Sequence, residues 1–556
     1  MTIVNQKMDT RCLSSLAKVF ADEEIVDSVF NKASALLNET YSFQVAYRVN
    51  DKQVENLTIR IESDLQDLIT SRAVGLAPSQ FPIYADHDEH VLRTTPGLFP
   101  DPLLPLENNQ LSIVHEQWHA VWMTVKLNAG VSPGLHPISV LFESPSGDVL
   151  GEETFELEVI PALLPEQQLT CTHWFHSDCI ATQYDVEVFS ERHWQLIEQY
   201  VATAADHGMN MLLTPLFTLP LDTEIGGERP TVQLVDVEKD GDDYSFGFDK
   251  LLRWVQMATE RGIKYIEFSH LFTQWGVAHA PKIVAYEDGQ LKKIFGWETE
   301  AQGEQYRQFL MQFLPSLVDF IKLHQLEERV YFHVSDEPSI ESLDAYKKAS
   351  DLLHRYLSDY PIIDALSDYQ FYEQGLVKKP IPANDCLEDF LQHDVPELWT
   401  YYCCAQYKEV SNRFFCFPSA RNRISGMQFY KFNIAGFLHW GYNFWYSRQS
   451  KSQIDPFNNT DADKGFPSGD SFLVYPGEDG PIESIRLEVF YDVLQDLRAL
   501  QLLEKLVGRE SVIELLEGTL ESPITFKDYP RDSELLLAKR EEVNRAIWEA
   551  HKAIAD

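Results

Sequence analysis

The segment VYFHVSDEPSIESLDAYKKASDLLHRYL, residues 330–357, contains one complete strand-and-helix unit of this chain. Its first part leans apolar and is typical of a strand, and it ends in two adjacent acids, Asp336 and Glu337, followed at once by Pro338. From residue 342 onward the apolar residues recur with helical spacing. Buried like charges repel each other, so two acids at the end of a core strand indicate either a solvated strand end or the mouth of a pocket.

The same order of strand and then helix recurs along residues 166–556. We expect eight strands, at 169–176, 209–217, 263–272, 330–337, 362–368, 398–404, 436–445 and 471–477. Helical spacing lies between or after them, most clearly at 192–208, 306–324, 342–357 and 484–506. Eight alternating units predict a (β/α)8 TIM-type barrel with inserted loops. The alternative, an open doubly wound sheet, usually has fewer strands and a glycine-rich first turn, which the segment HWFHSDC does not provide.

Residues 1–165 have a different pattern, with short alternating stretches separated by turn-forming clusters. Strands are expected at 43–49, 57–63, 120–127 and 137–144, while residues 22–37 are equivocal and also fit a helix. Many short strands with little helical spacing predict an antiparallel β-sandwich. Residues 160–167, IPALLPEQ, resemble a linker. The sequence therefore predicts two domains, a β-sandwich at 1–165 and a TIM-type barrel at 166–556.

Composition and charge narrow the possible partners. The 556 residues include 46 Lys and Arg against 86 Asp and Glu, which gives a formal net charge of −40. A surface this acidic repels phosphate backbones and anionic lipid, so we expect neither a nucleic-acid partner nor a membrane partner. The seven cysteines are an odd number and irregularly spaced, the N-terminus shows no export leader, and no apolar run is long enough to span a bilayer. These features predict a cytoplasmic protein.

The barrel prediction gives the acid pair a functional place. Active sites of TIM barrels lie at the C-terminal ends of the strands, where Asp336 and Glu337 close the fourth. Successive strand residues point to opposite faces, but Pro338 cannot extend the strand, so the chain turns and both carboxylates can lean toward the barrel mouth. Aromatic residues near other strand ends, such as Trp275 and Trp440, can stack on the apolar faces of sugar rings. The loops at 218–249 and 273–298 are expected to shape this pocket.

Five motifs occur in order along these strand ends: HVSDEPS, LWTYYCC, GFLHWGYNFW, GDSFLVYPG and SIRLE. Together with an N-terminal sandwich, they resemble glycoside hydrolase family 123. The resemblance implies an exo-acting enzyme that removes a terminal β-linked N-acetylhexosamine, with N-acetylgalactosamine favoured. It also implies retention of configuration through the sugar's own 2-acetamido group, with Glu337 as general acid and then base and Asp336 orienting the acetamide. No cofactor and no metal are implied.

Further residues are candidates for substrate binding. Tyr401 is expected to hydrogen-bond the acetamide oxygen, and tryptophans are expected to line the sugar subsite, namely Trp275, Trp440 and Trp445. Four polar residues are expected to hold hydroxyls or to brace the acids: Arg421, Asn443, Asp470 and Arg486. Simple packing is the alternative for each aromatic ring, and an ion pair with Glu483 or Glu488 is the alternative for Arg486.

The sequence gives little support for a metal site or for a reactive thiol. His173 and His176 fall on opposite faces of a strand, so with Asp178 they are a poor metal site. The cysteines 403, 404 and 416 lack a metal-binding spacing and are expected to be structural.

Two alternatives to the acetamide mechanism stay open. One is a glycosidase acting on unacetylated sugars, with Glu337 as acid and a distant nucleophile such as Glu267. The other is a non-catalytic carbohydrate-binding protein. In a cytoplasmic protein the expected partner is a small oligosaccharide or glycoside. The sequence leaves the sugar epimer and the oligomeric state open.

Overall fold

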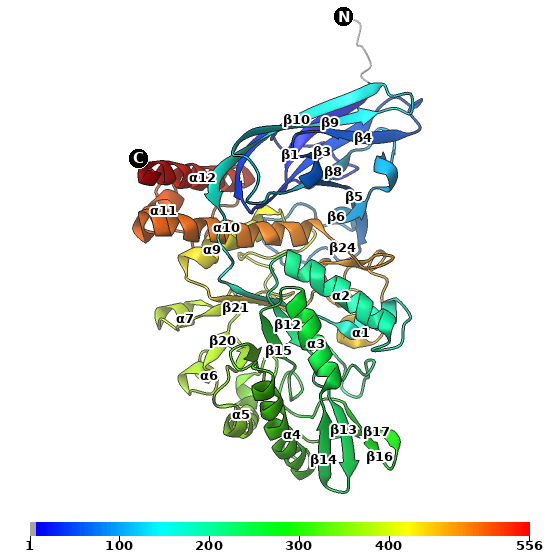
Figure 1. The fold of residues 1–556 in the computed structure, drawn as a ribbon, viewed down its shortest axis with the longest axis vertical. Helices are drawn as coiled ribbons and strands as arrows, with labels where there is room; N and C mark the ends of the chain where they lie inside the picture. The colour runs from blue at the N-terminus through cyan, green and yellow to red at the C-terminus, as the bar shows by residue number, and fades with distance from the viewer. Residues whose placement is uncertain (1–6, 556) are drawn as a thin grey trace, which may run out of the picture.

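The computed structural model describes residues 7–555. Residues 1–6, part of the stretch searched for a leader, and residue 556 lie outside the described residues. The chain is a mixed α and β protein with several sheets (Figure 1). Strands from the first 163 residues lie at one end, the helix α10 (Ile485–Val507) lies beneath them, and short strands with flanking helices follow.

The first part of the chain forms two five-stranded sheets. One has the order β1 (Met8–Ser14), β3 (Thr40–Val49), β8 (His119–Lys126), β5 (Ile69–Ser79) and β6 (Gly97–Pro105). The other has the order β2 (Lys32–Leu37), β10 (Val149–Leu163), β9 (Gly134–Glu143), β4 (Leu57–Glu62) and β7 (Gln110–Leu111). Alternate side chains of both sheets meet in one apolar cluster, in which the rings of Phe43 and Phe155 stack with centroids 4.1 Å apart.

The four strands expected in this region are confirmed as β3, β4, β8 and β9. The equivocal segment 22–37 contains no helix and ends in β2. The expected linker 160–167 is wrong in its first half, because β10 continues to Leu163 and pairs there with β2.

Eight short strands of the second part run parallel to their neighbours. They are β11 (Thr170–His173), β12 (Met211–Thr214), β15 (Tyr265–Phe268), β18 (Val330–Tyr331), β19 (Ile363–Ala365), β20 (Lys379–Ile381), β21 (Trp399–Tyr401) and β22 (Gly436–His439). Their ladders form three separate sheets, β11-β22-β21, β12-β15-β18 and β19-β20. Single bridges join these sheets, from Phe332 to Ile362 and from Ala383 to Tyr401.

Seven of the eight expected strands are present, and the eighth was misplaced. Residues 471–477 provide only β23 (Tyr475–Pro476), which pairs antiparallel with β24 (Pro481–Ile482). The missed strand is β20, which is three residues long and contains Pro380. A strand this short, with a proline inside it, carries no apolar alternation that a sequence pattern could detect.

The helices follow their sequence patterns closely. The expected segments correspond to α2 (Glu191–Asp206), α4 (Glu304–Leu323), α5 (Leu343–Leu357) and α10. Ser190 and Ser484 cap α2 and α10 through their side-chain oxygens, as the residue type predicts. Within the described residues, no helix is both long enough and apolar enough to cross a bilayer.

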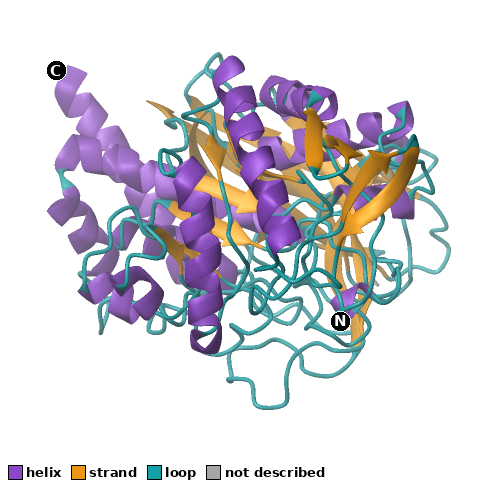
Figure 2. Ribbon diagram, turned by 90° about the horizontal axis from the view of Figure 1, so that it is seen from below, coloured by secondary structure: helices purple, strands orange, loops and turns teal. Residues whose placement is uncertain are grey.

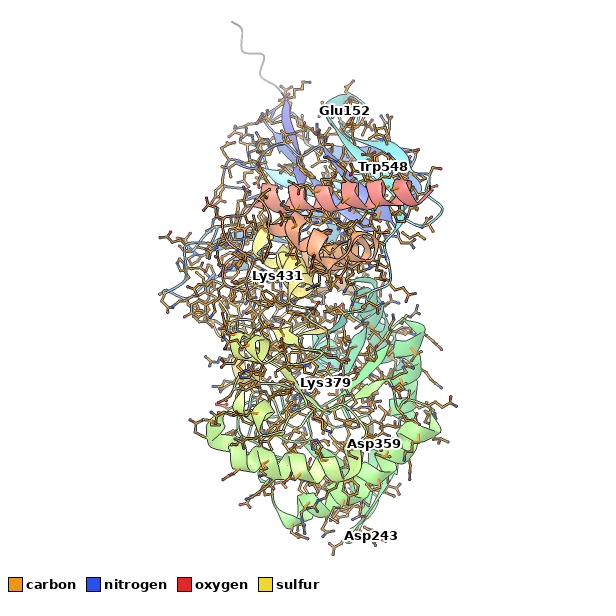
Figure 3. The ribbon with its side chains drawn as sticks, turned by 90° about the vertical axis from the view of Figure 1, so that its left-hand side faces the viewer. Glu152, Asp243, Asp359, Lys379, Lys431 and Trp548 are labelled. Atoms are coloured by element: carbon orange, nitrogen blue, oxygen red, sulfur yellow. The ribbon has the colours of Figure 1, made fainter. Side chains whose placement is uncertain are left out.

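The last helix, α12 (Ser533–Ala555), returns to the first part of the chain and packs on the sheet that contains β2 and β10 (Figures 1 and 3). Arg540 donates to Glu39 at 2.7 Å, and Asn544 Nδ2 donates to the carbonyl of Ser34 at 3.0 Å. The division at residue 165 therefore stays a prediction, and in packing terms α12 belongs beside β2 and β10.

Long connections extend the strand-and-helix part. Two of them form the four-stranded sheet β14 (Asp243–Gly247), β13 (Asp236–Asp240), β16 (Ile283–Glu287) and β17 (Gln290–Phe295), which protrudes at the lower end of Figure 1. Seen from below, loops occupy much of this face of the molecule (Figure 2).

Candidate active site

A cavity lies where the strand ends of the second part meet the long loops. Its volume is about 100 Å³, or about 570 Å³ when the space open to solvent at its mouth is counted. Its lining residues are Trp174, Leu221, Asp222, Gln274, Trp275, Asp336, Glu337, Ala365, Tyr401, Cys403, Cys404, Leu438, Trp440 and Phe466. Three of them are carboxylates, and among the described lining residues none is a lysine or an arginine.

The backbone at Asp336 and Glu337 brings both carboxylates to this cavity. The strand β18 ends at Tyr331, and the chain reaches Glu337 with φ of 44°, in the left-handed region. The N–H of Glu337 donates to Ala365 O at 3.0 Å, and Asp336 O accepts from the N–H of Trp275 at 3.0 Å. A non-glycine residue held in this region costs on the order of 1–3 kcal/mol and is common at functional sites. The left-handed turn removes the strand alternation that would send neighbouring side chains to opposite faces.

The two acids have different surroundings. Burial and then the negative charge of Glu337 raise the pKa of Asp336 well above its usual range, and the positive charge of His333 only partly opposes this. The side chain of Asp336 accepts no hydrogen bond from any described residue. Glu337 Oε1 accepts a hydrogen bond from the hydroxyl of Tyr401 at 2.6 Å. Burial and then the charge of Glu337 raise the pKa of Tyr401, so this hydroxyl keeps its proton and donates it.

A buried polar network supports the cavity floor. His333 contacts Glu267 Oε1 at 2.7 Å through Nε2 and Asp364 Oδ1 at 3.1 Å through Nδ1. Burial alone would lower the pKa of His333, but the bonds to Asp364 and Glu267 raise it to about 9. Glu267 also accepts from Trp174 Nε1 at 2.8 Å, and Trp174 lines the cavity. The network therefore ties a positive imidazolium to the wall of the cavity.

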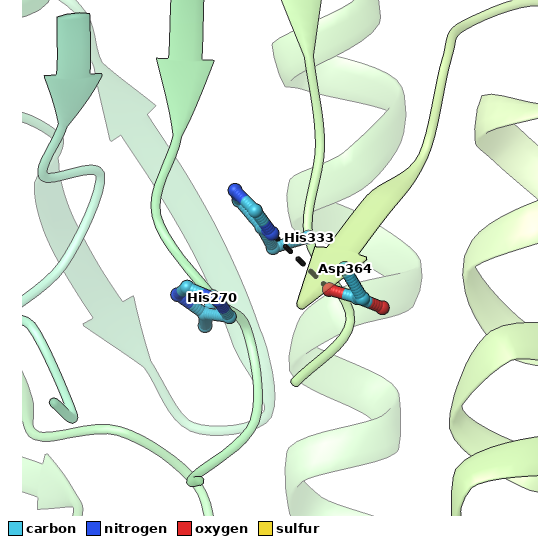
Figure 4. Close-up of side chains that lie close together, drawn as sticks. All are labelled: His270, His333 and Asp364. Carbon is cyan, nitrogen blue, oxygen red and sulfur yellow. Dashed lines mark hydrogen bonds and ion pairs between the residues drawn. The ribbon is translucent and has the colours of Figure 1, made fainter. Parts of the chain in front are cut away.

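Two groups of side chains offer atoms that could hold a metal ion. In the first, the donor atoms of His270, His333 and Asp364 lie within 4.8 Å of one another (Figure 4). The two imidazole rings stack with centroids 4.2 Å apart, and both nitrogens of His333 already face carboxylates. Stacked rings do not aim their lone pairs at one point, so this geometry favours a hydrogen-bonded imidazolium over a metal ligand.

The second group contains His207, Glu483 and Glu488. Arg72 forms ion pairs with both glutamates, so the carboxylates already have a cationic partner. Arg72 is in β5 and Glu488 is in α10, and none of the three residues of this group lines the cavity.

The structure brings five of the ten predicted site residues into the cavity wall: Trp275, Asp336, Glu337, Tyr401 and Trp440. Trp275 is 52% exposed, so its ring is free to contact a ligand. Asp470 lies behind Trp440 and accepts from its Nε1 at 2.9 Å. Burial raises the pKa of Asp470 to about 7, against the opposing charge of Arg413.

The other four predicted residues lie away from the cavity, and their polar groups are already used. Asn443 Oδ1 accepts from the N–H of His176 at 2.9 Å, and Trp445 Nε1 donates to Val474 O at 3.2 Å. Arg421 donates two hydrogen bonds to Asp88, each at 2.8 Å.

Arg486 forms a buried ion pair with Asp101 of β6, at 2.8 and 2.9 Å, and does not pair with the acids of its own helix. The partners of Arg421 and Arg486 lie more than 300 residues earlier in the chain, where local spacing gives no information.

The other candidates considered from the sequence also have structural partners. His173 Nδ1 and His176 Nδ1 each face an arginine, Arg413 at 3.0 Å and Arg229 at 3.1 Å. Asp178 pairs with Arg229. Glu267, the candidate nucleophile, is fully buried and absent from the cavity lining, with Thr172 Oγ1 donating to its second oxygen at 2.5 Å.

Several lining residues escaped the sequence analysis. Asp222, Gln274, Trp174 and Phe466 line the cavity and were not predicted as site residues. Cys403 and Cys404, which the sequence predicted to be structural, also line it. All seven cysteines are free. The prediction that loops 218–249 and 273–298 shape the pocket is confirmed, because Leu221 and Asp222 come from the first and Gln274 and Trp275 from the second. Asp222 is not part of any sequence motif. Its position in the loop 218–249 was the only signal that placed it near the pocket.

Adjacent carboxylates and aromatic rings around one cavity at parallel strand ends are typical of glycosidases. A comparison of the sequence with models of protein families identifies the family. The model of the catalytic domain of glycoside hydrolase 123 matches residues 174–503, which is more than half of the chain. The protein belongs to glycoside hydrolase family 123.

Solved structures give a consistent fold. A family 123 glycoside hydrolase from Clostridium perfringens, studied for glycolipid glycan hydrolysis, is 17% identical with a TM-score of 0.75, and 99% of each chain is covered. An endo-β-1,4-mannanase from Thermotoga petrophila is 12% identical with a TM-score of 0.34, covering 60% of this chain and 77% of that one. The second similarity is too low to support an argument, and no curated protein matches.

Proposed function

We propose that the protein is a retaining exo-glycosidase that removes a terminal β-linked N-acetylhexosamine, with N-acetylgalactosamine favoured, by substrate-assisted catalysis. The observation that carries this proposal is that Asp336 and Glu337 share one cavity while Glu267, the conventional nucleophile considered from the sequence, is sealed beneath it. With Glu267 out of reach, the acetamide of the sugar can attack the anomeric carbon, as in glycosidases that use substrate assistance.

In the first step the acetamide oxygen attacks the anomeric carbon, and the bond from that carbon to the departing oxygen breaks. The proton of Glu337 moves to the departing oxygen, and an oxazoline-like intermediate remains. In the second step water attacks the anomeric carbon, Glu337 takes the proton of the water, and the acetamide is restored. Asp336 accepts the N–H of the acetamide and balances the positive charge that develops on it.

The proton of the acid pair has to change place when substrate binds. In the empty cavity the raised pKa of Asp336 favours a proton on Asp336. An acetamide N–H that donates to Asp336 stabilises the ionised form, and two coupled carboxylates then leave the proton on Glu337. Tyr401 is 2.6 Å from Glu337 and holds that carboxyl in place for the departing oxygen. Trp440 and Trp275 supply ring faces for the sugar and for the group attached to it.

We expect the protein to cleave an aryl N-acetyl-β-galactosaminide and to bind an N-acetyl thiazoline, whose ring mimics the oxazoline. Glu337→Gln should lower kcat at least about 1000-fold, because the departing oxygen then receives no proton. An aryl group of low pKa should recover much of this loss, since such a group departs without protonation. The measurement is a panel of aryl glycosides with and without the acetamide, in both epimers, with thiazoline binding followed by calorimetry.

The outcomes separate the alternatives. Cleavage of unacetylated glycosides without thiazoline binding would favour a separate nucleophile, and binding without cleavage would favour a non-catalytic carbohydrate-binding protein. A glycolipid headgroup belongs in the panel because the Clostridium perfringens relative was studied on such glycans. The expected partner remains a small oligosaccharide or glycoside, and the seven free thiols support the prediction of a cytoplasmic location.

We also propose that the second part of the chain is a TIM-type barrel and that the first part is a β-sandwich. The ring order β12-β15-β18-β19-β20-β21-β22-β11 supports a TIM-type barrel whose ladders are interrupted, with the N–H of Asn210 donating to Cys171 O at 3.1 Å between β11 and β12. The common apolar core of the first two sheets supports a β-sandwich.

A further inference from the structure

Asp222 is a third carboxylate of the cavity, and two other segments of the chain fix its position. Its N–H donates to Gln274 Oε1 at 2.7 Å, in the loop after β15. Its carbonyl accepts from Ser450 Oγ at 2.6 Å, in the segment after β22. Its φ of 39° lies in the left-handed region, which aspartate adopts more readily than most residues. A side chain held this firmly is suited to recognising a fixed group on a ligand.

The two oxygens of Asp222 have different partners. Oδ2 accepts the N–H of Gln449 at 2.8 Å, whereas Oδ1 has no hydrogen-bond donor among the described residues. The residue is 9% exposed and is one of the residues that line the cavity. An unpaired carboxylate oxygen at this depth needs a donor from the ligand or from water.

Charged groups of both signs lie near the Asp222 carboxylate. Arg229 and Arg448 lie near enough to act on the carboxylate, and Asp222 in turn raises the pKa of Asp336. Burial raises the pKa of Asp222 to about 6, opposed by the hydrogen bond from Gln449. Above that pH the cavity wall carries the charge of Asp222 beside the acid pair, with no cation among its described lining residues.

We infer that Asp222 is a specificity-determining residue that accepts a hydrogen bond from a free hydroxyl of the terminal sugar and thereby excludes sugars sulfated or phosphorylated at that hydroxyl. This inference rests on the proposed function and adds the substrate class, an N-acetylhexosaminide with an unmodified hydroxyl at the contacted position. A sulfate there would remove the donor and bring its own negative charge against three carboxylates.

The test combines a variant with deoxygenated substrates. Asp222→Asn keeps an oxygen for the N–H of Gln449, so the backbone position should survive. Wild-type protein should lose roughly 10- to 100-fold in kcat/KM on the aryl N-acetylhexosaminide that lacks the contacted hydroxyl, among the 3-, 4- and 6-deoxy compounds. The variant should show the same loss on the parent substrate and less than about threefold further loss on that deoxy compound. Asp455→Asn is the matched control, because Asp455 also accepts a backbone N–H (Phe457, 3.0 Å) but lies outside the cavity.

Sulfated substrates provide the second arm. The wild type should cleave the aryl glycoside sulfated at the contacted position at least about 100-fold more slowly than the parent, and Asp222→Asn should narrow this ratio. Equal losses in both proteins for every deoxy compound would overturn the inference. Labelling of Asp222 by a 2-deoxy-2-fluoro glycoside would also overturn it, since the residue would then be a nucleophile.

If the variant fails to fold, the wild-type panel still decides, because tolerance of all three deoxy compounds and of the sulfated ones contradicts the role. Failure to cleave the parent acetamido glycoside would instead contradict the proposed function.

Discussion

At the scale of single residues, the left-handed turn at Glu337 allows two neighbouring acids to serve one cavity. An extended backbone would separate their side chains, whereas this turn directs both to the same space. The closeness has an energetic cost, because each charge opposes ionisation of the other. The proposed mechanism needs one protonated and one ionised carboxyl at the same time, which this mutual effect favours.

The cost at Asp336 gives a prediction for Asp336→Asn. Well below pH 3.8, the ordinary pKa of an aspartate, the carboxyl is neutral in both the folded and the unfolded protein. At pH 4 the unfolded chain is only about half ionised at this residue, so the substitution should change stability little there. As the pH rises, the unfolded chain ionises freely while the raised pKa resists ionisation in the fold. The wild type therefore loses stability that the variant keeps, and the variant should be more stable at pH 7.5 than the wild type while its kcat falls about 100-fold or more.

Urea denaturation at pH 4 and pH 7.5 measures this difference. Asp288→Asn is the control, since Asp288 is 91% exposed and should show the same small effect at both values. A variant that is less stable than the wild type at pH 7.5 would contradict the assignment of the strained charge to Asp336.

The sequence predicted the cavity residues that follow strand ends and failed on residues whose partners are remote. Asp336, Tyr401 and Trp440 follow from strand ends that converge in a parallel arrangement. Arg421 lies near the same strands in sequence, but only the fold brings Asp88 to its guanidinium. Asp222 was missed because its role depends on Gln274 and Gln449, which no local pattern connects to it.

At the scale of elements, the eight parallel strands of the second part are two to four residues long and depend on close packing. Gly436 begins β22 and faces the indole of Trp399 in β21, where an added Cβ would overlap the ring. The sequence predicted β21 and β22 from their apolar runs, but it could not show that one of them requires glycine. β20 escaped prediction because three residues provide no pattern.

Gly436→Ala should therefore lower the free energy of unfolding by about 1–3 kcal/mol, since the ring or the strand has to move. Gly97→Ala is the matched control in β6, where the nearest atom to an added Cβ is the flexible end of Arg93 at 3.3 Å. We expect the control to lose clearly less stability in urea denaturation. Equal losses would show that the contact with Trp399 is not the cause.

At the scale of the whole molecule, buried ion pairs join the first sheets to α10 and α12. Arg486 pairs with Asp101, Arg72 with Glu488, and Arg540 with Glu39. Their side chains are at most 10% exposed, so a partner left alone would be a buried, uncompensated charge. These contacts favour cooperative unfolding of the two parts.

Arg486→Met should lower the free energy of unfolding by about 3–5 kcal/mol, because it leaves Asp101 buried without its cationic partner. The double variant Asp101→Asn/Arg486→Met should recover part of the loss. Hydrogen exchange in urea should show β8 and β22 losing protection together, in the wild type and in the variant. Loss of protection in β22 at a lower urea concentration than in β8 would contradict a shared transition.

The packing of α12 on β2 also has a consequence for synthesis of the chain, because the two elements are made far apart in time. Ser34 in β2 receives its hydrogen-bond partner Glu541 from a position 507 residues later in the chain. At about 5–20 residues per second, a ribosome needs roughly 25–100 s to make that interval. The side of β2 that α12 covers lacks this partner throughout, so a chaperone has a long time to bind the nascent chain there before the final helix is made.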